Sequence, residues 1–236
     1  MSANRVPSVL ENVHANPVLC DPAIVDTPLT DLSSAVMPQP LRRPFYDRPP
    51  EVVARELIGK LLLRETSAGL CGGLIVETEA YLAEGDSACH AAKGQTPRNA
   101  SMFGPPGHAY VYSIHAKWCV NVVTEQAGVA SAVLIRALEP LINLELLQAR
   151  RPLATTRDLA RGPARLCSAL EVTRAQDGLD LTVAEQLWIA RSAGLKLSPD
   201  SIGTSTRIGV TSAHDLPLRF YLRGSSFVSG PKKLNR

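Results

Sequence analysis

The sequence predicts a mixed α+β fold, and three observations favour this class. β-Rich stretches dominate the middle and the end of the chain, helical stretches flank them, and the order lacks the regular strand–helix alternation of a doubly wound sheet. The 236 residues are 45% hydrophobic and 20% charged, which suits one globular domain, or one domain plus a tail. We therefore expect a single domain built on a curved, mostly antiparallel β-sheet, with flanking helices and a protruding β-hairpin.

Residues 1–45 differ from the rest of the chain. Nine of the 18 prolines fall in the first 50 residues, and neither a helical nor a strand period persists there. Such a composition is typical of a flexible or loosely attached segment. We expect a flexible, proline-rich leader over residues 1–45 and a folded domain over residues 46–236.

The first elements of the domain follow this leader. Asp47, followed by prolines, predicts a capped helix start, and Gly59 ends the helix. The expected apolar face of this helix consists of Val52, Val53, Leu57 and Ile58. Residues 60–66 and 72–81 read as two strands joined by a short turn, so a hairpin is expected.

Residues 84–107 form a long polar loop, rich in glycine and proline. Loops beyond about 12–15 residues are usually functional or disordered. Residues 108–124 are aromatic and β-branched, which predicts a strand pair with a tight turn and exposed tip around His115–Lys117. A further strand is expected from Val129.

The remaining segments predict helices and then strands. Residues 140–151 and 162–170 are expected to be helical, the second with a proline at its start. Residues 180–190 are ambiguous between helix and strand. Residues 206–210 and 217–229 are expected to be strands.

Charge is unevenly distributed along the chain, whose net charge is +3. Residues 150–236 carry 14 Lys/Arg against 7 Asp/Glu, whereas residues 1–149 carry 11 against 15. The basic excess could form a phosphate-facing surface, or it could be ordinary solvated surface.

Location and cofactors are constrained by what the sequence lacks. There is no signal-peptide pattern and no apolar run of the roughly 18 residues that a membrane helix needs, so we expect a cytoplasmic protein with no membrane partner. Five scattered cysteines without a CxxC motif indicate reduced thiols. Cys89–His90 has no second close pair, so we expect neither a metal site nor another cofactor.

Two glutamates in VETEAY are the most informative feature. Residues i and i+2 share a face of a strand, so Ile75, Glu77, Glu79 and Tyr81 should point the same way. In one interpretation the strand leaves the core and enters a cleft at Glu79, where partial burial raises the pKa of a carboxyl group toward general-base use. In the other, each glutamate pairs with an arginine on a neighbouring strand.

Aromatic residues gather along the chain near these glutamates. Three of the five tyrosines lie between 81 and 112, close to His90. Such rings could stack on a flat ligand such as a nucleobase, or they could form a plain aromatic core. His90 by itself is equally compatible with a hydrogen-bonded loop histidine.

The motifs IVETEAY, QTPRNASMFGPPGHAYVY, NVV, VLIRALEP, GPARLC and PLRFYLRGSSFVS occur in this order. This arrangement resembles the alkyladenine (3-methyladenine) DNA glycosylase family of base-excision repair. The resemblance runs from about Glu51 to Ser229, nearly all of the chain after the leader.

The resemblance implies roles for six residues. Glu79 matches the general base that activates water, and Arg136 of RALEP matches the arginine that helps to hold that water. The flipped-out base would be sandwiched by Tyr81, His90 and Tyr112, with the His90 backbone reading its edge. Asn121 matches the asparagine that excludes normal guanine by clashing with its exocyclic amine. Glu77 would then be a structural partner.

The sequence departs from the family at the expected hairpin tip. Family members usually carry a tyrosine there that fills the gap left by the base, whereas this chain has YVYSIHAKWCVN, with His115 at that place and one residue fewer before Asn121. His115 could act as the wedge, or Lys117 or Trp118 could replace it. Such a side chain would offset part of the cost of unstacking.

The implied activity is hydrolysis of the N-glycosidic bond of alkylated or deaminated purines in double-stranded DNA. Because VETEAY and RALEP contain no lysine for a Schiff base, we expect a monofunctional enzyme that leaves an abasic site. We also expect a bacterial-type, nucleoid-associated monomer. Gly162 and Arg165 at a helix start would seat a DNA phosphate, with Arg207, Arg219 and Arg223 as weaker candidates.

Two other functions fit part of the pattern. A glycosidase of free sugars or nucleosides would also use two carboxylates, and both would then be essential. A non-catalytic nucleic-acid-binding protein would explain the altered hairpin tip. Base release from a lesion duplex, by the wild type and by Glu79→Gln, distinguishes the three.

Overall fold

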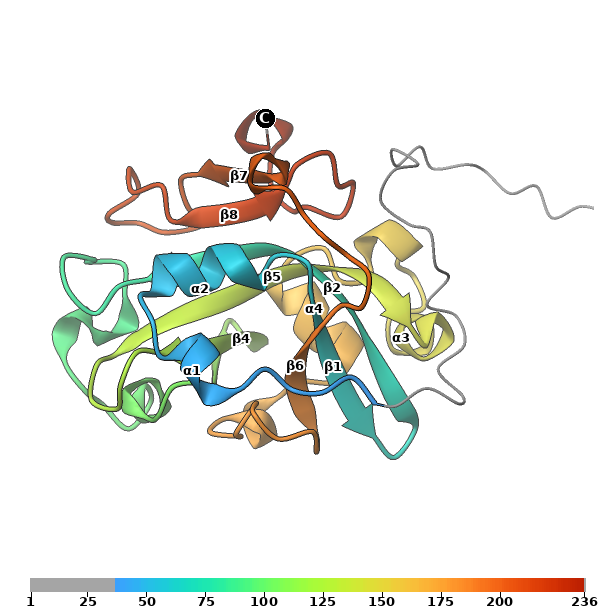
Figure 1. Cartoon of the computed structure of the whole chain (residues 1–236), viewed down its shortest axis with the longest axis horizontal. Helices are drawn as coiled ribbons and strands as arrows, with labels where there is room; N and C mark the ends of the chain where they lie inside the picture. Colours follow the sequence, from blue (N-terminus) through green and yellow to red (C-terminus); the bar gives the residue numbers. More distant parts are fainter. Residues whose placement is uncertain (1–36, 236) are drawn as a thin grey trace, which may run out of the picture.

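An eight-stranded antiparallel β-sheet organises the chain, which the computed structural model describes over residues 37–235 (Figure 1). Its strands are β1 (Lys60–Thr66), β2 (Gly69–Tyr81), β3 (Ala109–Ile114), β4 (Lys117–Thr124), β5 (Ser131–Ile142), β6 (Leu187–Arg191), β7 (Ile202–Ser205) and β8 (Arg219–Leu222). The main path runs β3-β4-β5-β2-β1-β6, while β8 pairs with β2 and β7. The predicted α+β fold with a mostly antiparallel sheet is confirmed.

Short helices surround the sheet. The α-helices are α1 (Arg43–Tyr46), α2 (Pro50–Leu57), α3 (Leu144–Arg150) and α4 (Pro163–Leu170). The 3-10 helices are η1 (His90–Lys93), η2 (Ala100–Phe103), η3 (Thr156–Asp158), η4 (Arg174–Gln176), η5 (Pro199–Ser201) and η6 (Lys232–Leu234). No helix in the described range is long and apolar enough to cross a membrane.

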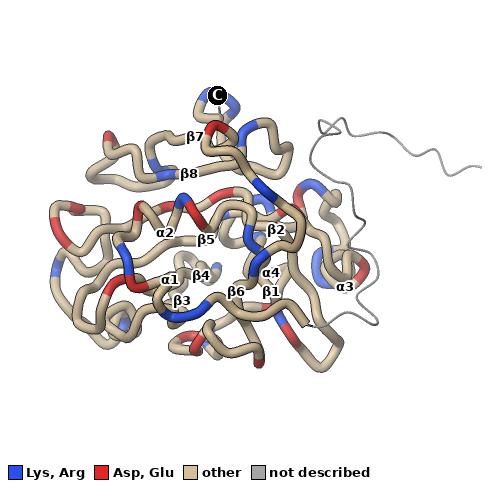
Figure 2. Tube along the Cα trace, viewed as in Figure 1, with Lys and Arg blue, Asp and Glu red and all other residues tan. Residues whose placement is uncertain are grey.

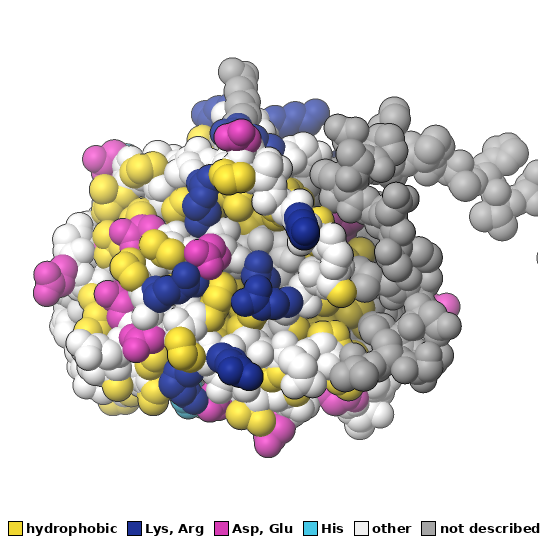
Figure 3. Space-filling model, in the orientation of Figure 1, with side chains coloured by type: hydrophobic (Ala, Val, Ile, Leu, Met, Phe, Trp, Pro, Cys, Tyr) yellow, Lys and Arg dark blue, Asp and Glu magenta, His cyan; other side chains and the backbone are white. Residues whose placement is uncertain are grey.

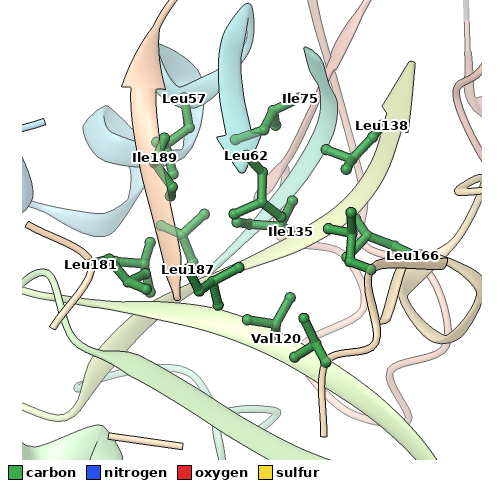
Figure 4. Packing of buried hydrophobic residues seen from close by; sticks show 14 of the residues in the cluster. Leu57, Leu62, Ile75, Val120, Ile135, Leu138, Leu166, Leu181, Leu187 and Ile189 are labelled. Carbon is green, nitrogen blue, oxygen red and sulfur yellow. The ribbon is translucent and has the colours of Figure 1, made fainter. Parts of the chain in front are cut away.

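The main core lies where α2 and α4 cover one face of the sheet. Leu57 of α2 and Leu166 of α4 pack with strand residues such as Ile75, Ile135 and Leu138 (Figure 4). A second cluster on the other face includes Trp188 of β6 and Tyr221 of β8. A third is aromatic and lies around β3 and β4. The sheet is therefore buried on both faces along its centre.

A β-bulge in β2 changes which side chains share a face. Pairing with β5 shifts register between Ile75 and Thr78, so Ile75 and Ala80 both reach the main core although their positions differ in parity. The expectation that Ile75, Glu77 and Glu79 point the same way is therefore wrong. The extra residue bends and twists the strand, which turns both glutamates away from the main core.

Several helix and strand boundaries differ from the prediction. The Asp47 cap is wrong, because the α2 N-cap is Pro49 without a side-chain cap, and Asp47 ends α1 instead. Val52 lies on the exposed side, and the buried face of α2 contains Val53, Ala54 and Leu57. The segment from Pro140 continues β5 to Ile142, because helix α3 begins only after Asn143, whose side chain accepts from the Leu146 N–H group.

The end of the chain also differs from expectation. The strand expected at 206–210 is a loop, and its predecessor β7 (residues 202–205) pairs with β8 instead. The ambiguous segment 180–190 becomes a loop followed by strand β6. The hairpins at 60–81 and 109–124 and helix α4 agree with the prediction.

The expected domain boundary falls inside a packed segment. Trp188 donates to the Pro38 carbonyl, and the Leu41 N–H donates to the Ile189 carbonyl, so residues 38–41 contact β6. The domain therefore starts before residue 46. Most of the expected leader, residues 1–36, lies outside the described residues.

Charged residues are spread over many elements rather than concentrated in one (Figure 2). Side chains of both signs appear on the face seen in Figure 3. Four cysteines of the described part, Cys71, Cys89, Cys119 and Cys167, are free and buried. No group of His, Cys, Asp and Glu between residues 37 and 235 is arranged to hold a metal ion.

Candidate active site

The two glutamates of β2 lie between two arginines on neighbouring strands. β2 pairs with β5 on one side and with β8 on the other. Arg136 of β5 and Arg219 of β8 both reach Glu77, with Nε–Oε1 distances of 2.9 and 2.7 Å. All four side chains of this buried charge network (Glu77, Glu79, Arg136 and Arg219) are at most 8% exposed.

Glu79 has three polar contacts. Its Oε2 lies 3.0 Å from an Arg136 terminal nitrogen and accepts a 3.0 Å hydrogen bond from the Tyr81 hydroxyl. Its Oε1 accepts a 2.7 Å hydrogen bond from the Ile208 N–H group. Burial raises the pKa of the Glu79 carboxyl, and Arg136 and the Ile208 N–H only partly oppose this rise. A raised pKa suits a general base.

Glu77 occupies a different electrostatic environment. Burial acts to raise its pKa, but Arg136, Arg219 and the Ser229 side chain outweigh burial, so the pKa lies below its usual value. Glu77 therefore stays ionised, while Glu79 binds a proton more readily. The alternative in which the glutamates pair with arginines on neighbouring strands is what the structure shows.

A cavity of about 390 Å³ opens next to this network. Its volume is within the range of small-ligand sites, roughly 300–1,000 Å³. It is lined by aromatic, apolar and small polar residues from four parts of the chain: Tyr81, Ser87–His90, Ala92, Lys93, Met102, Tyr110, Tyr112, Ile114, Asn121 and Gly209–Ser212.

His90, Tyr110 and Tyr112 form one aromatic wall. The His90 and Tyr112 rings meet edge to face with centroids 4.4 Å apart, and His90 Nδ1 shares a 2.8 Å hydrogen bond with the Tyr110 hydroxyl. Burial, with a smaller effect of Arg98, lowers the His90 pKa, so the ring is neutral near pH 7. These residues are an aromatic cluster and a cavity wall at once.

Tyr81 connects the cavity to the charge network. Its ring lines the cavity while its hydroxyl contacts Glu79. Glu79 itself is fully buried and does not line the cavity, so the strand does not enter a cleft at Glu79 as expected. The carboxylate lies directly behind the wall, because the loop after β7 and the Tyr81 side chain cover it.

That covering loop is held by a buried ion pair. Arg207 donates to both oxygens of Asp86, at 2.6 and 2.7 Å, and both side chains are fully buried. The Arg207 guanidinium also lies 4.6 Å from the centroid of the Tyr81 ring. Asp86 and Arg207 thereby bring together two cavity walls that are 121 residues apart in sequence.

Two asparagines fix the remaining walls. Asn121 lines the cavity and donates to the Tyr110 carbonyl at 2.9 Å, which sets the orientation of its amide. Asn99 of the QTPRN motif is buried and makes four hydrogen bonds within the loop, including one to the His90 carbonyl. Asn99 therefore holds the segment that carries His90.

The hairpin tip is a two-residue turn. His115 and Ala116 both have positive φ, 47° and 59°, and Ile114 pairs with Lys117. His115 and Lys117 are exposed. Trp118 instead pairs with Ser113 on the other face of the hairpin and packs against the main core. This placement disfavours Trp118 as a side chain that enters a base stack.

The residues that were expected to contact a DNA phosphate lie outside the aromatic cavity. Gly162 precedes α4, and Arg165 is half exposed and pairs with Asp158 at 2.6 Å; neither lines the aromatic cavity. Two of the weaker candidates are excluded as surface contacts, because Arg207 and Arg219 are buried and paired internally.

Sequence reasoning missed several residues of the site. Asp86, Met102, Ser229 and the Ile208 N–H group were not singled out, and Arg219 was considered only as a weaker candidate for a phosphate contact. Short-range patterns could not find them, since each joins the site through contacts over long sequence separations. A local signal existed for Asn99 and Met102, which lie in QTPRNASMFGPPGHAYVY, and for Ser229, which ends PLRFYLRGSSFVS, but these motifs indicated the family and not the role of each residue.

The comparison with known proteins agrees with this geometry. The sequence model of the family described as Methylpurine-DNA glycosylase (MPG) matches residues 44–226. The chain belongs to this family. It is therefore a DNA glycosylase, a hydrolase of N-glycosyl bonds that acts in the repair of alkylated DNA bases.

The matches to individual relatives span most of this chain and most of each relative. Three of them are named "Putative 3-methyladenine DNA glycosylase". The protein of Rhodopseudomonas palustris is 52% identical over 195 residues, which is 82% of this chain and 92% of the relative. Those of Mesorhizobium japonicum and Rhodopirellula baltica are 50% and 48% identical, covering 77% and 81% of this chain and 86% and 84% of the relatives.

Proposed function

We propose that this glycosylase releases alkylated or deaminated purines, such as 3-methyladenine, 7-methylguanine and hypoxanthine, from double-stranded DNA. The observation that carries this proposal is the position of Glu79, which contacts Arg136 on one side and the cavity-lining Tyr81 on the other. A buried carboxylate behind an aromatic cavity is arranged for hydrolysis at a flat base.

In this mechanism the damaged nucleotide rotates out of the duplex and its base enters the cavity. Tyr81 supports one side of the base, while His90 and Tyr112 support the other. Asn121 disfavours guanine through its exocyclic amine. Extrusion costs less when the lesion already pairs weakly.

The chemical step is a displacement at C1′. Water attacks C1′ and transfers a proton to Glu79, the C1′–N bond breaks, and its electron pair leaves with the base. Arg136 helps to position the water, and the carboxylate stabilises the positive charge that develops on the sugar. Glu79 is buried in the structure, so the Tyr81 side chain or the loop formed by Gly209–Ser212 must shift when DNA binds, to let the carboxylate reach the water at C1′.

The hairpin tip and the basic second half would hold the DNA. His115 or Lys117 at the exposed tip would enter the duplex, and Gly162 and Arg165 would contact a phosphate.

His115→Ala should raise the dissociation constant for lesion DNA while leaving the saturated cleavage rate less affected. Binding should also weaken steeply with salt, since phosphate contacts release counterions.

We also propose that the product is an intact strand with an abasic site. Since no lysine occurs in VETEAY or RALEP to form a Schiff base, borohydride trapping with lesion duplex should give no covalent complex with wild type. Lys93 lines the cavity and is the residue to test. A trapped complex that is lost in Lys93→Ala would show lyase chemistry instead.

The deciding experiment is excision from a panel of lesion duplexes by wild type and by Glu79→Gln. We expect base release by wild type only, with lesion-DNA binding kept in the variant. Base release by Glu79→Gln at the wild-type rate would contradict the proposed general base. The free-sugar hydrolase gains no support, because Glu77, its second carboxylate, pairs with both Arg136 and Arg219 and does not line the cavity.

A further inference from the structure

Arg136 divides its guanidinium between two carboxylates. Its Nε donates to Glu77 Oε1 at 2.9 Å, and one terminal nitrogen lies 3.0 Å from Glu79 Oε2. The other terminal nitrogen donates to the Ser229 hydroxyl at 3.4 Å. A guanidinium commonly binds one carboxylate through two parallel hydrogen bonds. Here Arg136 makes one contact with each carboxylate, a hydrogen bond to Glu77 and a 3.0 Å ion pair with Glu79.

Glu77 is itself fixed from the side opposite Arg136. Arg219 Nε donates to Glu77 Oε1 at 2.7 Å, and the Ser229 N–H donates to Oε2 at 2.7 Å. Arg219 in turn donates to the carbonyls of Ser229 and Leu234 and to the side chain of Asn235. Glu77 therefore has a fixed position that the chain end and β8 determine.

We propose that Glu77 is a positioning residue for the hydrolysis: held by Arg219 and Ser229, it keeps Arg136 from closing as a two-pronged ion pair on Glu79. This inference rests on the proposed role of Glu79 as the base. It assigns Glu77 a part in the reaction beyond its part in stability, although Glu77 touches neither the cavity nor the reacting atoms.

The physical consequence concerns the basicity of Glu79. Without Glu77, Arg136 is free to direct two N–H groups at Glu79, and one neighbouring negative charge is gone. Both changes favour the ionised form of Glu79, so its pKa falls and it becomes a weaker base. The other charged or titratable groups near Glu79 are Tyr81 on β2, Tyr112 on β3, Cys119 on β4 and Arg207 in the loop after β7.

The test is a set of single-turnover pH–rate profiles on a duplex oligonucleotide with one hypoxanthine, at saturating enzyme. For Glu77→Gln we expect a rate about tenfold lower near pH 7.5 and an acid limb displaced to lower pH. The dissociation constant for the duplex should stay within about twofold of wild type, since Glu77 does not reach the cavity. Glu139→Gln, a carboxylate on β5 outside the charge network, is the matched control and should leave all three quantities unchanged.

A second variant keeps the test informative if Glu77→Gln does not fold. Should Glu77→Gln fail to fold because Arg219 is left unpaired, the double variant Glu77→Gln/Arg219→Gln removes both charges and should show the same displaced acid limb. A folded variant with the wild-type rate and acid limb overturns the inference, as does lost DNA affinity with an unmoved acid limb. Absence of base release by wild type from every duplex of the lesion panel would instead overturn the proposed function.

Discussion

The Tyr81 side chain carries two tasks that belong to different parts of the site. Its ring is part of the cavity wall, and its hydroxyl donates to Glu79. The hydrogen bond favours the ionised carboxylate and so opposes the rise in pKa that burial causes. Removing the hydroxyl separates the two tasks, because a phenyl ring keeps the wall.

We expect Tyr81→Phe to move the acid limb of the pH–rate profile to higher pH, because the Glu79 pKa rises further. Activity should fall several-fold, about three- to tenfold, at pH 6 and recover toward wild type at pH 8. Single-turnover rates across this range provide the measurement. Tyr110→Phe, whose hydroxyl contacts His90 rather than Glu79, is the control and should leave the acid limb in place. Displacement of the limb to lower pH in Tyr81→Phe would contradict this account.

At the scale of elements, the hairpin of β3 and β4 contains local backbone strain. Its two turn residues have positive φ, which disfavours any residue with a Cβ atom. Two-residue hairpin turns of this kind normally select glycine or asparagine. The chain nevertheless has His115 and Ala116 there, which is consistent with selection of the tip for something other than stability.

Ala116→Gly should therefore stabilise the protein, by about 0.5–1 kcal/mol, because glycine adopts this backbone conformation without steric cost. Urea unfolding monitored by circular dichroism would measure the change. Ala175→Gly in η4, where φ is not positive, should destabilise instead. If both variants lose stability, the strain assigned to the turn is not present in solution.

The loop over residues 84–107 depends on one buried side chain. Asn99 accepts from the N–H and hydroxyl groups of Thr96 and donates to the carbonyls of His90 and Gly94. The length of this segment indicated a functional or a disordered loop, and these contacts explain how so long a loop is ordered.

Asn99→Ala should loosen the segment that carries His90, at a cost of about 1–3 kcal/mol for the groups left unpaired. Hydrogen exchange of the amides between residues 90 and 99 should accelerate, and affinity for lesion DNA should fall. Asn99→Asp keeps the two acceptor contacts and loses the two donor contacts, so it should be intermediate. Unchanged exchange in Asn99→Ala would show that the rest of the loop suffices.

At the scale of the whole molecule, the cavity exists because distant segments are tied together. Asp86 follows β2, and Arg207 follows β7, yet the two form a fully buried pair. Burial acts to raise the Asp86 pKa, but the hydrogen bonds from Arg207 outweigh it, so the folded-state pKa lies below the usual value. The pair therefore contributes stability above the unfolded-state pKa of about 3.9, and this contribution is lost as pH falls through the folded-state pKa.

Arg207→Met should cost about 3–5 kcal/mol at neutral pH, because it leaves Asp86 buried without its partner. The double variant Asp86→Asn/Arg207→Met should recover part of that loss, and its stability should depend less on pH below about pH 4. Equilibrium urea unfolding at several pH values measures both effects. Arg165→Met breaks a partly exposed pair with Asp158 and should cost less than about 1 kcal/mol. Equal losses in Arg165→Met and Arg207→Met would refute the argument from burial.

Local patterns determined much of this protein. The strand at VETEAY, the hairpin of residues 109–124 and the proline-led helix α4 follow from periodicity and turn chemistry over a few residues, and the ordered motifs identified the family. The same patterns gathered Glu79, Tyr81, His90 and Tyr112 in one region of the sequence, and the structure places them in or beside one cavity.

Only the tertiary structure decided which contacts these residues make. The bulge at residues 75–78 reverses the side-chain alternation, and it arises from pairing with β5 rather than from the sequence of β2 alone. The partners Arg136 and Arg219 lie 59 and 142 residues from Glu77, and the cover of Glu79 comes from Ile208. Periodicity reports the neighbours that a residue has along the chain, whereas the ionisation of a buried carboxylate depends on charges that folding brings to it from other strands.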